Sequence, residues 1–152
     1  MRLNFVHCHG SGNDFPLIDA RALSLPDAQW TAVARALADR GGPVGGDGLL
    51  LLGAGDGEAA FAMRMFNSDG SEAETCLNGL RCVARMGFEA MGLTQAIARL
   101  KTTLAEVSRD ADLASGVYTV RERAGPASLA VRDWPMDIGV DRAVQALSLI
   151  HI

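Results

Sequence analysis

The chain has 152 residues, 49% of them hydrophobic, a formal net charge of -4 and a pI near 5.3. This length and composition fit one domain with a hydrophobic core. An acidic chain without a cluster of Lys and Arg argues against a nucleic-acid partner or an anionic membrane surface, and no apolar run has the length of a membrane span. Because the N-terminus also lacks the apolar segment of a secretory signal, we expect a cytoplasmic protein.

The first predicted elements are two strands and a helix. Arg2–His7 and Phe15–Asp19 have strand patterns, and the turn-forming residues 10–14 (GSGND) separate them. Asp27 is predicted to cap a helix that ends before the glycine pair at 41 and 42. Apolar residues recur in this segment at helical spacing: Trp30, Val33, Ala34, Leu37 and Ala38.

The middle of the chain predicts two further strands and a second helix. Leu49–Leu52 is fully apolar, and apolar residues alternate with less apolar ones over Ala59–Phe66. Both patterns indicate strands. After a polar, turn-like stretch at 67–74, apolar residues fall at helical spacing from near Asn78 to Gly92. The residues on this apolar face are Leu80, Val83, Ala84, Gly87, Phe88 and Met91.

The last third predicts more strands, at Leu100–Leu104, Val117–Arg123 and Ser128–Arg132, with a turn at 110–116 between the first two. Few helices separate the strands, which favours an α/β fold of the α+β type with a mostly antiparallel sheet. The apolar stretch at 142–152 has no cap or stop signal, so we assign it no functional role.

Three cysteines, Cys8, Cys76 and Cys82, fit neither a disulfide framework nor a zinc site, and we expect free thiols. Lys101 is the only lysine and lies in an ordinary stretch, which argues against pyridoxal phosphate, so we expect no cofactor. The HxH pair at 7 and 9 has no third ligand at useful spacing, so we expect no metal.

Cys76 directly precedes the second predicted helix. Unpaired N–H groups and the helix dipole are therefore expected to lower its pKa from about 8.5 to about 7.5 and to make it a usable acid or base. The same N–H groups, from Leu77 through Gly79, are suited to holding a carboxylate. The alternative is that Cys76 is a small buried hydrophobe, which is our interpretation of Cys8 and Cys82.

Several motifs resemble, in order and spacing, those of the diaminopimelate epimerase family: HGSGNDF at 9–15, GGDGLLLL at 45–52, FNSDGSE at 66–72 and CLNGLRC at 76–82. VYTV and MDIG further along are also similar, so that the resemblance covers about residues 1–140. It implies half of a two-domain fold, in which a curved sheet wraps a central helix.

The resemblance also implies a cofactor-independent mechanism with two cysteines, one removing the α-hydrogen and the other delivering a proton to the opposite face. It places Cys76 as one acid/base, Asn13 and Asn67 as substrate-binding side chains, and Asn78 and Gly79 in an anion-holding turn. Leu77 stands where the family usually has glycine, and its N–H remains available to the substrate. The family converts LL-diaminopimelate to the meso isomer for lysine and peptidoglycan synthesis.

We therefore expect residues 1–141 to form the N-terminal domain, residues 142–152 to be a tail of doubtful origin, and the family's C-terminal domain to be absent. Such a chain is expected to be weakly active or inactive alone, with a small-molecule amino-acid substrate as its partner and possibly a second copy in a homodimer. Alternatives are a proline racemase-like or phenazine-biosynthesis-like isomerase, or a folded, non-catalytic fragment. Without the motifs, Asn13 and Asn67 would be turn residues that bind their own backbone.

Overall fold

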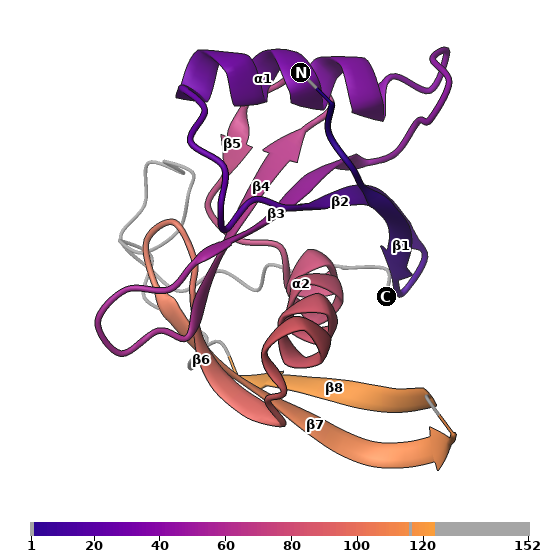
Figure 1. The fold of residues 1–152 in the computed structure, drawn as a ribbon. Helices are drawn as coiled ribbons and strands as arrows, with labels where there is room; N and C mark the ends of the chain where they lie inside the picture. Colours follow the sequence, from indigo (N-terminus) through magenta and orange to yellow (C-terminus); the bar gives the residue numbers. More distant parts are fainter. Residues whose placement is uncertain (1, 116, 124–152) are drawn as a thin grey trace, which may run out of the picture.

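The computed structural model describes residues 2–115 and 117–123, in which one curled sheet surrounds a helix (Figure 1). The strands follow the order β1-β2-β3-β4-β6-β7-β8, and β5 pairs with β4. The elements are β1 Val6–Gly10, β2 Asn13–Asp19, α1 Asp27–Ala38, β3 Gly48–Ala54, β4 Phe61–Asn67, β5 Glu72–Ala73, α2 Leu77–Met91, β6 Gln95–Arg99, β7 Leu104–Ala114 and β8 Val117–Arg123.

Most neighbouring strands run antiparallel, and the two parallel pairs occur where a helix lies between the strands in sequence. The chain passes through α1 between β2 and β3, and through α2 between β4 and β6, and these two pairs are parallel. A parallel pair requires such a crossover, whereas a short turn suffices for an antiparallel pair. The predicted α+β fold with a curved, mostly antiparallel sheet is confirmed.

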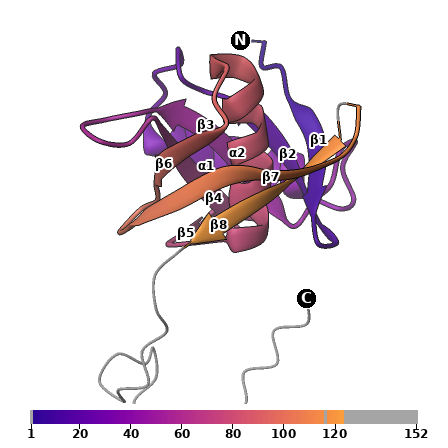
Figure 2. The same cartoon turned by 90° about the horizontal axis from the view of Figure 1, so that it is seen from below.

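The two helices cover opposite faces of the sheet. Leu50 and Leu52 point to α2, whereas Leu49 and Leu51 point to α1, so every residue of this run is buried. A strand that is covered on both faces loses the polar alternation of a half-exposed strand, which explains the apolar run. Figures 1 and 2 show α2 between β1 to β4 on one side and β6 to β8 on the other.

Both ends of α2 follow the sequence prediction closely. Its first residue is Leu77, and Gly92 at its C-terminus adopts a left-handed conformation with φ of 67°. The N–H of Leu93 then donates to the carbonyl of Phe88 at 3.1 Å, which satisfies a carbonyl of the last turn. None of the helices in the part of the chain described here is long and apolar enough to cross a membrane.

The N-terminal elements differ from the prediction at their boundaries. β1 starts at Val6 and extends to Gly10, so only Ser11 and Gly12 remain in the turn, with φ of 51° and 95°. Two positive φ angles match the right-handed twist of a tight hairpin. Asp27 is the first residue of α1, and Pro26 occupies the N-cap position that was predicted for Asp27. The Asp27 carboxylate pairs with Arg64 at 2.9 Å.

The strands after α2 were only partly predicted. β6 was missed, and the segment predicted as a strand at Leu100–Leu104 is mostly the turn between β6 and β7, closed by a bond from the N–H of Leu100 to the carbonyl of Thr103 at 2.9 Å. β7 runs through most of the predicted turn at 110–116, while Val117–Arg123 is a strand as predicted. The predicted strand Ser128–Arg132, the MDIG motif and the stretch 142–152 lie outside the described residues.

Candidate active site

Cys76 is the N-terminal cap of α2. Its backbone is extended, with φ of -154° and ψ of 99°, and its Sγ accepts a hydrogen bond from the N–H of Gly79 at 3.3 Å. The N–H of Asn78 is also directed at this sulfur. The sequence-based placement of Cys76 at the start of the helix, with backbone donors facing its sulfur, is therefore confirmed.

The direction of the expected pKa shift at Cys76 was wrong. Partial burial raises the pKa of the Cys76 thiol, and the N–H groups of Gly79 and Asn78 offset this only in part, while Cys82 and Asp47 raise it further. Burial opposes the charged form of a thiol, and the argument from the helix dipole omitted this cost. In this chain Cys76 rests as a thiol at neutral pH.

The first turn of α2 fits tightly around the sulfur. A Cβ at Gly79 would lie 2.7 Å from Cδ2 of Leu50 and 3.2 Å from the Cys76 Sγ, so a larger residue here would have to displace the Leu50 side chain. Two of the three N–H groups predicted to hold a carboxylate, those of Asn78 and Gly79, point to the sulfur. The third N–H belongs to Leu77, the first residue of the helix, and this residue is 41% exposed.

The β1–β2 hairpin brings Asn13 onto this helix terminus. The Nδ2 of Asn78 donates to the Oδ1 of Asn13 at 2.6 Å, across 65 residues of sequence. The two backbones approach closely because position 10 is glycine: a Cβ at Gly10 would lie 2.2 Å from the carbonyl oxygen of Asn78. Asn13, Cys76 and Asn78 therefore form one group, which we call the Cys76 cluster.

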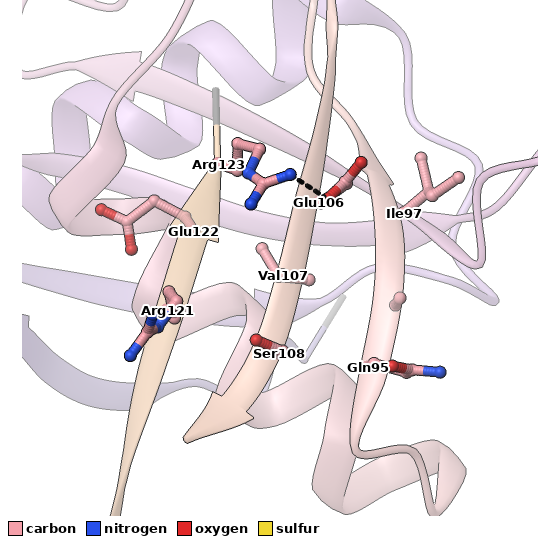
Figure 3. Close-up of a pocket in the computed structure, with 9 residues that line it drawn as sticks. Gln95, Ile97, Glu106, Val107, Ser108, Arg121, Glu122 and Arg123 are labelled. Atoms are coloured by element: carbon pink, nitrogen blue, oxygen red, sulfur yellow. Dashed lines mark ion pairs between the residues drawn. The ribbon is translucent and has the colours of Figure 1, made fainter. Parts of the chain in front are cut away.

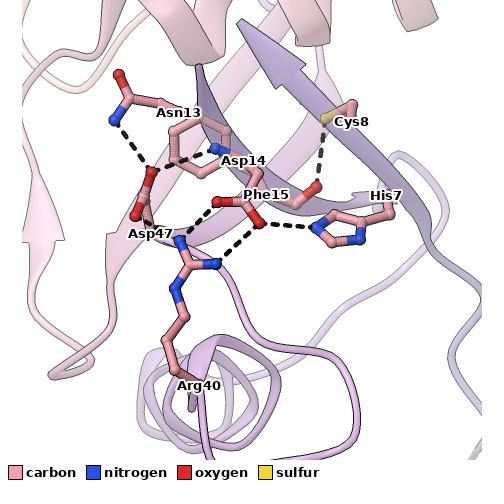
Figure 4. A network of polar contacts seen from close by, with 7 residues as sticks. All are labelled: His7, Cys8, Asn13, Asp14, Phe15, Arg40 and Asp47. Atoms are coloured by element: carbon pink, nitrogen blue, oxygen red, sulfur yellow. Dashed lines mark hydrogen bonds and ion pairs between the residues drawn. The ribbon is translucent and has the colours of Figure 1, made fainter.

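A network of charges holds the other end of Asn13 (Figure 4). Its Nδ2 donates to the Oδ2 of Asp47 at 3.0 Å, and the Arg40 guanidinium donates to Asp47 at 2.7 Å and to Asp14 at 2.6 and 3.1 Å. Asp14 also accepts from His7 at 3.1 Å. Both ends of the Asn13 amide are thus fixed, which orients the side chain.

This network changes the acidity of both carboxyl groups. The hydrogen bond from Arg40 holds the pKa of Asp14 below its usual value. Partial burial raises the pKa of Asp47, but the hydrogen bonds from Asn13 and Arg40 outweigh it and hold this pKa below its usual value as well. The carboxylates are therefore charged at neutral pH, as a fixed acceptor for Asn13 requires.

Asn67 lies near the Cys76 cluster without a direct bond to it. It ends β4 opposite Gly48, the residue after Asp47, and its Nδ2 donates to the Oγ of Ser71 at 3.0 Å. Among the described residues, no hydrogen bond joins Asn67 to Asn13, Cys76 or Asn78. The structure thus brings together all the predicted site residues except Asn67. Asn67 lies on β4, where it pairs with Gly48 of β3.

Arg40, Asp47 and Arg81 were not predicted as parts of this arrangement. Arg81 donates to the Oδ1 of Asn78 at 2.9 Å and pairs with Glu122 at 2.6 Å. Asp47 belongs to the GGDG motif at 45–48, which was the available signal. Arg40 carried no signal, because its partners lie in other segments of the chain.

We predict that Arg40→Gln raises the pKa of both Asp14 and Asp47 toward the usual value. The carboxylates would lose their shared cation, because glutamine is uncharged and its side chain is shorter than that of arginine. A depressed pKa stabilises the folded state above the usual carboxyl pKa, and this contribution disappears as pH falls through the folded-state value. The variant should therefore lose stability at pH 7 but not in strong acid.

Carboxyl resonances followed by NMR during a pH titration would measure both shifts. Arg21→Gln is the matched control, because Arg21 pairs with Asp19 at 2.6 Å away from the cluster. This control should raise the pKa of Asp19 and leave Asp14 and Asp47 unchanged. Unaltered titration of Asp14 and Asp47 in the Arg40 variant would contradict the role given to this guanidinium.

A separate hollow lies over β6, β7 and β8 (Figure 3). It is lined by Gln95, Glu106, Ser108 and the arginines at 121 and 123, among others, and an ion pair joins Arg123 to Glu106 at 3.6 Å. It shares no lining residue with the Cys76 cluster, and we assign it no part in the chemistry.

Several solved structures share this fold. A phenazine biosynthesis protein of the PhzF family from Bacillus anthracis matches with a TM-score of 0.57 and 16% identity, over 74% of this chain and 38% of that one. A protein from Pseudomonas aeruginosa described as a predicted epimerase matches with a TM-score of 0.59 and 18% identity, over 74% of this chain and 40% of that one. At these identities the similarity defines the fold alone.

Sequence similarity defines the family. The model of the diaminopimelate epimerase family matches residues 5–108, and the chain belongs to this family. Diaminopimelate epimerase of Erythrobacter litoralis is 51% identical over 59% of this chain and 33% of its own length. That of Synechocystis is 40% identical over 79% of this chain and 42% of its own length. The chain thus spans about a third of the first of these relatives.

Proposed function

We propose that this chain forms one acid/base half of a diaminopimelate epimerase active site. Cys76 exchanges a proton with the α-carbon of diaminopimelate. Asn13 and Asn67, with the backbone of Leu77, Asn78 and Gly79, bind the substrate. The main support is the Cys76 cluster itself: a thiol at a helix N-terminus, beside an amide pair joined at 2.6 Å, in a chain of this family.

The proposed chemistry suits a helix N-terminus. Removal of the α-hydrogen leaves an electron pair next to the substrate carboxylate, and fixed N–H donors stabilise the developing charge. Because burial raises the Cys76 pKa, its resting form is a proton donor, and it acts as a base only in the thiolate form. The cofactor-independent reaction needs a second group on the opposite face of the α-carbon.

Neither of the other cysteines takes this second role in our proposal. Cys8 lies on β1 and Cys82 on the body of α2, and both line a hollow whose lining does not include Cys76. The proposed second acid/base is therefore the cysteine that the resemblance assigns to the family's other domain. We propose that the 152-residue chain alone is a poor epimerase, and that the complete activity supplies meso-diaminopimelate for lysine and peptidoglycan synthesis in the cytoplasm.

A phenazine-biosynthesis-like isomerase is less well supported. The similarity to such proteins concerns the fold, at 16% identity for the protein from Bacillus anthracis. The family match and the motifs at 9–15 and 66–72 favour diaminopimelate instead.

Hydrogen exchange at the α-carbon tests the proposal directly. We expect the chain, incubated with LL-diaminopimelate in D2O, to incorporate deuterium at the α-carbon while the substrate stays LL. A single thiolate removes the proton and returns a deuteron to the same face, so exchange proceeds without inversion. The rate should rise about tenfold per pH unit below the thiol pKa, because only the thiolate acts as a base. Mass spectrometry and chiral chromatography measure both quantities.

The controls separate the possible outcomes. Cys76→Ser should abolish exchange, whereas Cys82→Ser should retain it, because Cys82 has no part in the proposed chemistry. Absence of exchange at every pH, equal exchange in the Cys76 variant, or exchange of proline instead of diaminopimelate would contradict the proposal. Formation of the meso isomer would show that both acid/base groups lie within this chain.

A further inference from the structure

Cys8 and Cys82 form a second pair of reactive groups, apart from Cys76. Cys8 lies on β1, two residues before the Gly10 that packs against Asn78, and Cys82 lies on α2, one helical turn after Asn78. Cys8 packs against the core cluster that contains Cys82, and both thiols are free. The sequence suggested only that each residue fills space, whereas the fold places both cysteines at one hollow between β1 and α2.

A hollow gives small solutes access to this pair. It has a volume of about 640 Å³ and lies between β1, α2 and β8. Both cysteines line it, together with Arg81, Arg85 and Tyr118. Cys82 is 9% exposed and Cys8 is partly buried, so the thiols face the hollow without projecting into bulk solvent.

The two sulfurs have different environments. The Cys8 S–H donates to the carbonyl of Phe15 at 3.4 Å. The neighbouring Cys8 thiol, with the nearby Arg81 and Arg85, holds the pKa of Cys82 below its usual value, although burial opposes this. The pKa of Cys8 is raised by the neighbouring Cys82 and by burial. One sulfur is thus suited to attack an oxidant and the other to react second.

We propose that Cys8 and Cys82 form an oxidation site, in which a hydroperoxide converts the two thiols to a disulfide between β1 and α2. The Cys82 thiolate attacks one peroxide oxygen, the O–O bond breaks, and Cys82 becomes a sulfenic acid while the departing hydroxide takes up a proton to give water. Cys8 then attacks the Cys82 sulfur, the S–O bond breaks, and the leaving hydroxide takes the Cys8 proton. Two thiols and one hydrogen peroxide give one disulfide and two waters.

Cys76 is not a partner in this disulfide. The Cys76 sulfur accepts a hydrogen bond from the N–H of Gly79. Cys76 caps the helix and lies six residues before Cys82. Residues six apart lie on different faces of a helix, whereas Cys8 and Cys82 line the same hollow from β1 and α2. The bond would fasten the hairpin that carries Asn13 to the helix that carries Cys76 and Asn78. The inference does not depend on the proposed function.

Peptide mapping tests the site, because trypsin separates the three cysteines. Cleavage after arginine places them in the peptides Leu3–Arg21, Met65–Arg81 and Cys82–Arg85. The folded chain is treated with hydrogen peroxide, alkylated and digested. We expect mass spectrometry to find Leu3–Arg21 joined to Cys82–Arg85 as the main product, while Met65–Arg81 remains alkylated. Dithiothreitol should reverse the cross-link.

Variants and a denatured sample complete the experiment. Cys76→Ser should keep the cross-link, and Cys8→Ser and Cys82→Ser should each abolish it. In urea the preference for one pair should disappear, because the chain no longer holds the sulfurs together. The oxidised chain should also unfold at a higher urea concentration than the reduced one, since the disulfide closes a long loop. A cross-link through Cys76, oxidation of Cys82 to a sulfinic acid without a cross-link, or no reaction would overturn the proposal.

Discussion

Gly10→Ala is expected to separate the hairpin from α2 and to destabilise the fold by about 3 kcal/mol, at the upper end of the usual cost of overpacking. The new Cβ would lie 2.2 Å from the carbonyl oxygen of Asn78. A backbone oxygen cannot rotate away as a side chain can, so one of the two segments must move. The displacement should break the contact between Asn13 and Asn78.

Urea denaturation measures the loss of stability, and the side-chain amide resonances of Asn13 and Asn78 report on their contact. Gly41→Ala is the matched control, because its Cβ would meet only the Oδ1 of Asp39, at 3.3 Å, which belongs to a flexible side chain. This control should change stability by less than about 0.5 kcal/mol. A Gly10 variant with native stability and unshifted amide resonances would contradict the close approach.

Phe61→Ala is expected to cost about 3 to 5 kcal/mol, as is usual when a large aromatic side chain is removed from a core. Phe61 is 0% exposed at the start of β4, opposite Ala54 on β3 and Ala98 on β6. Its ring lies against α2, since a Cβ at Gly87 would be 3.1 Å from it. These small neighbours cannot collapse into the space that the ring would leave.

The free energy of unfolding of this variant should be compared with that of Phe5→Ala. Phe5 is 42% exposed and lies before β1, so its removal should cost less than about 0.5 kcal/mol. If both variants lost similar stability, the contact of the Phe61 ring with α2 would not be the main packing between β4 and the helix.

The predictable part of the fold is the part in which burial leaves a regular pattern. α2 shows an apolar face and a glycine stop, and Leu49–Leu52 is apolar because both helices cover it. β7 has no such pattern, because the residues after Ser108 are exposed on both faces and include Asp110 and Asp112. Asp110 and Asp112 form ion pairs with arginines. This part of β7 therefore has the polar composition that is usual for a turn.

The candidate site was predictable where a local motif places a residue at an element's end. Asn13 and Cys76 were assigned in this way, and the fold links them through Asn78. Arg40 was missed because its bonds join the connection between α1 and β3, which also carries Asp47, to Asp14 on β2. The pKa direction at Cys76 was missed because it depends on burial, which a sequence does not display.

Each polar atom of the Asn13 amide already has one partner: its nitrogen donates to Asp47, and its oxygen accepts from Asn78. A primary amide carries a second N–H and a second lone pair, so each atom keeps the capacity for one more hydrogen bond. A ligand that used this remaining capacity would add bonds without breaking the two that exist. The bonds to Asp47 and Asn78 would then decide the direction from which the amide meets a ligand, so that orientation is settled before binding instead of during it.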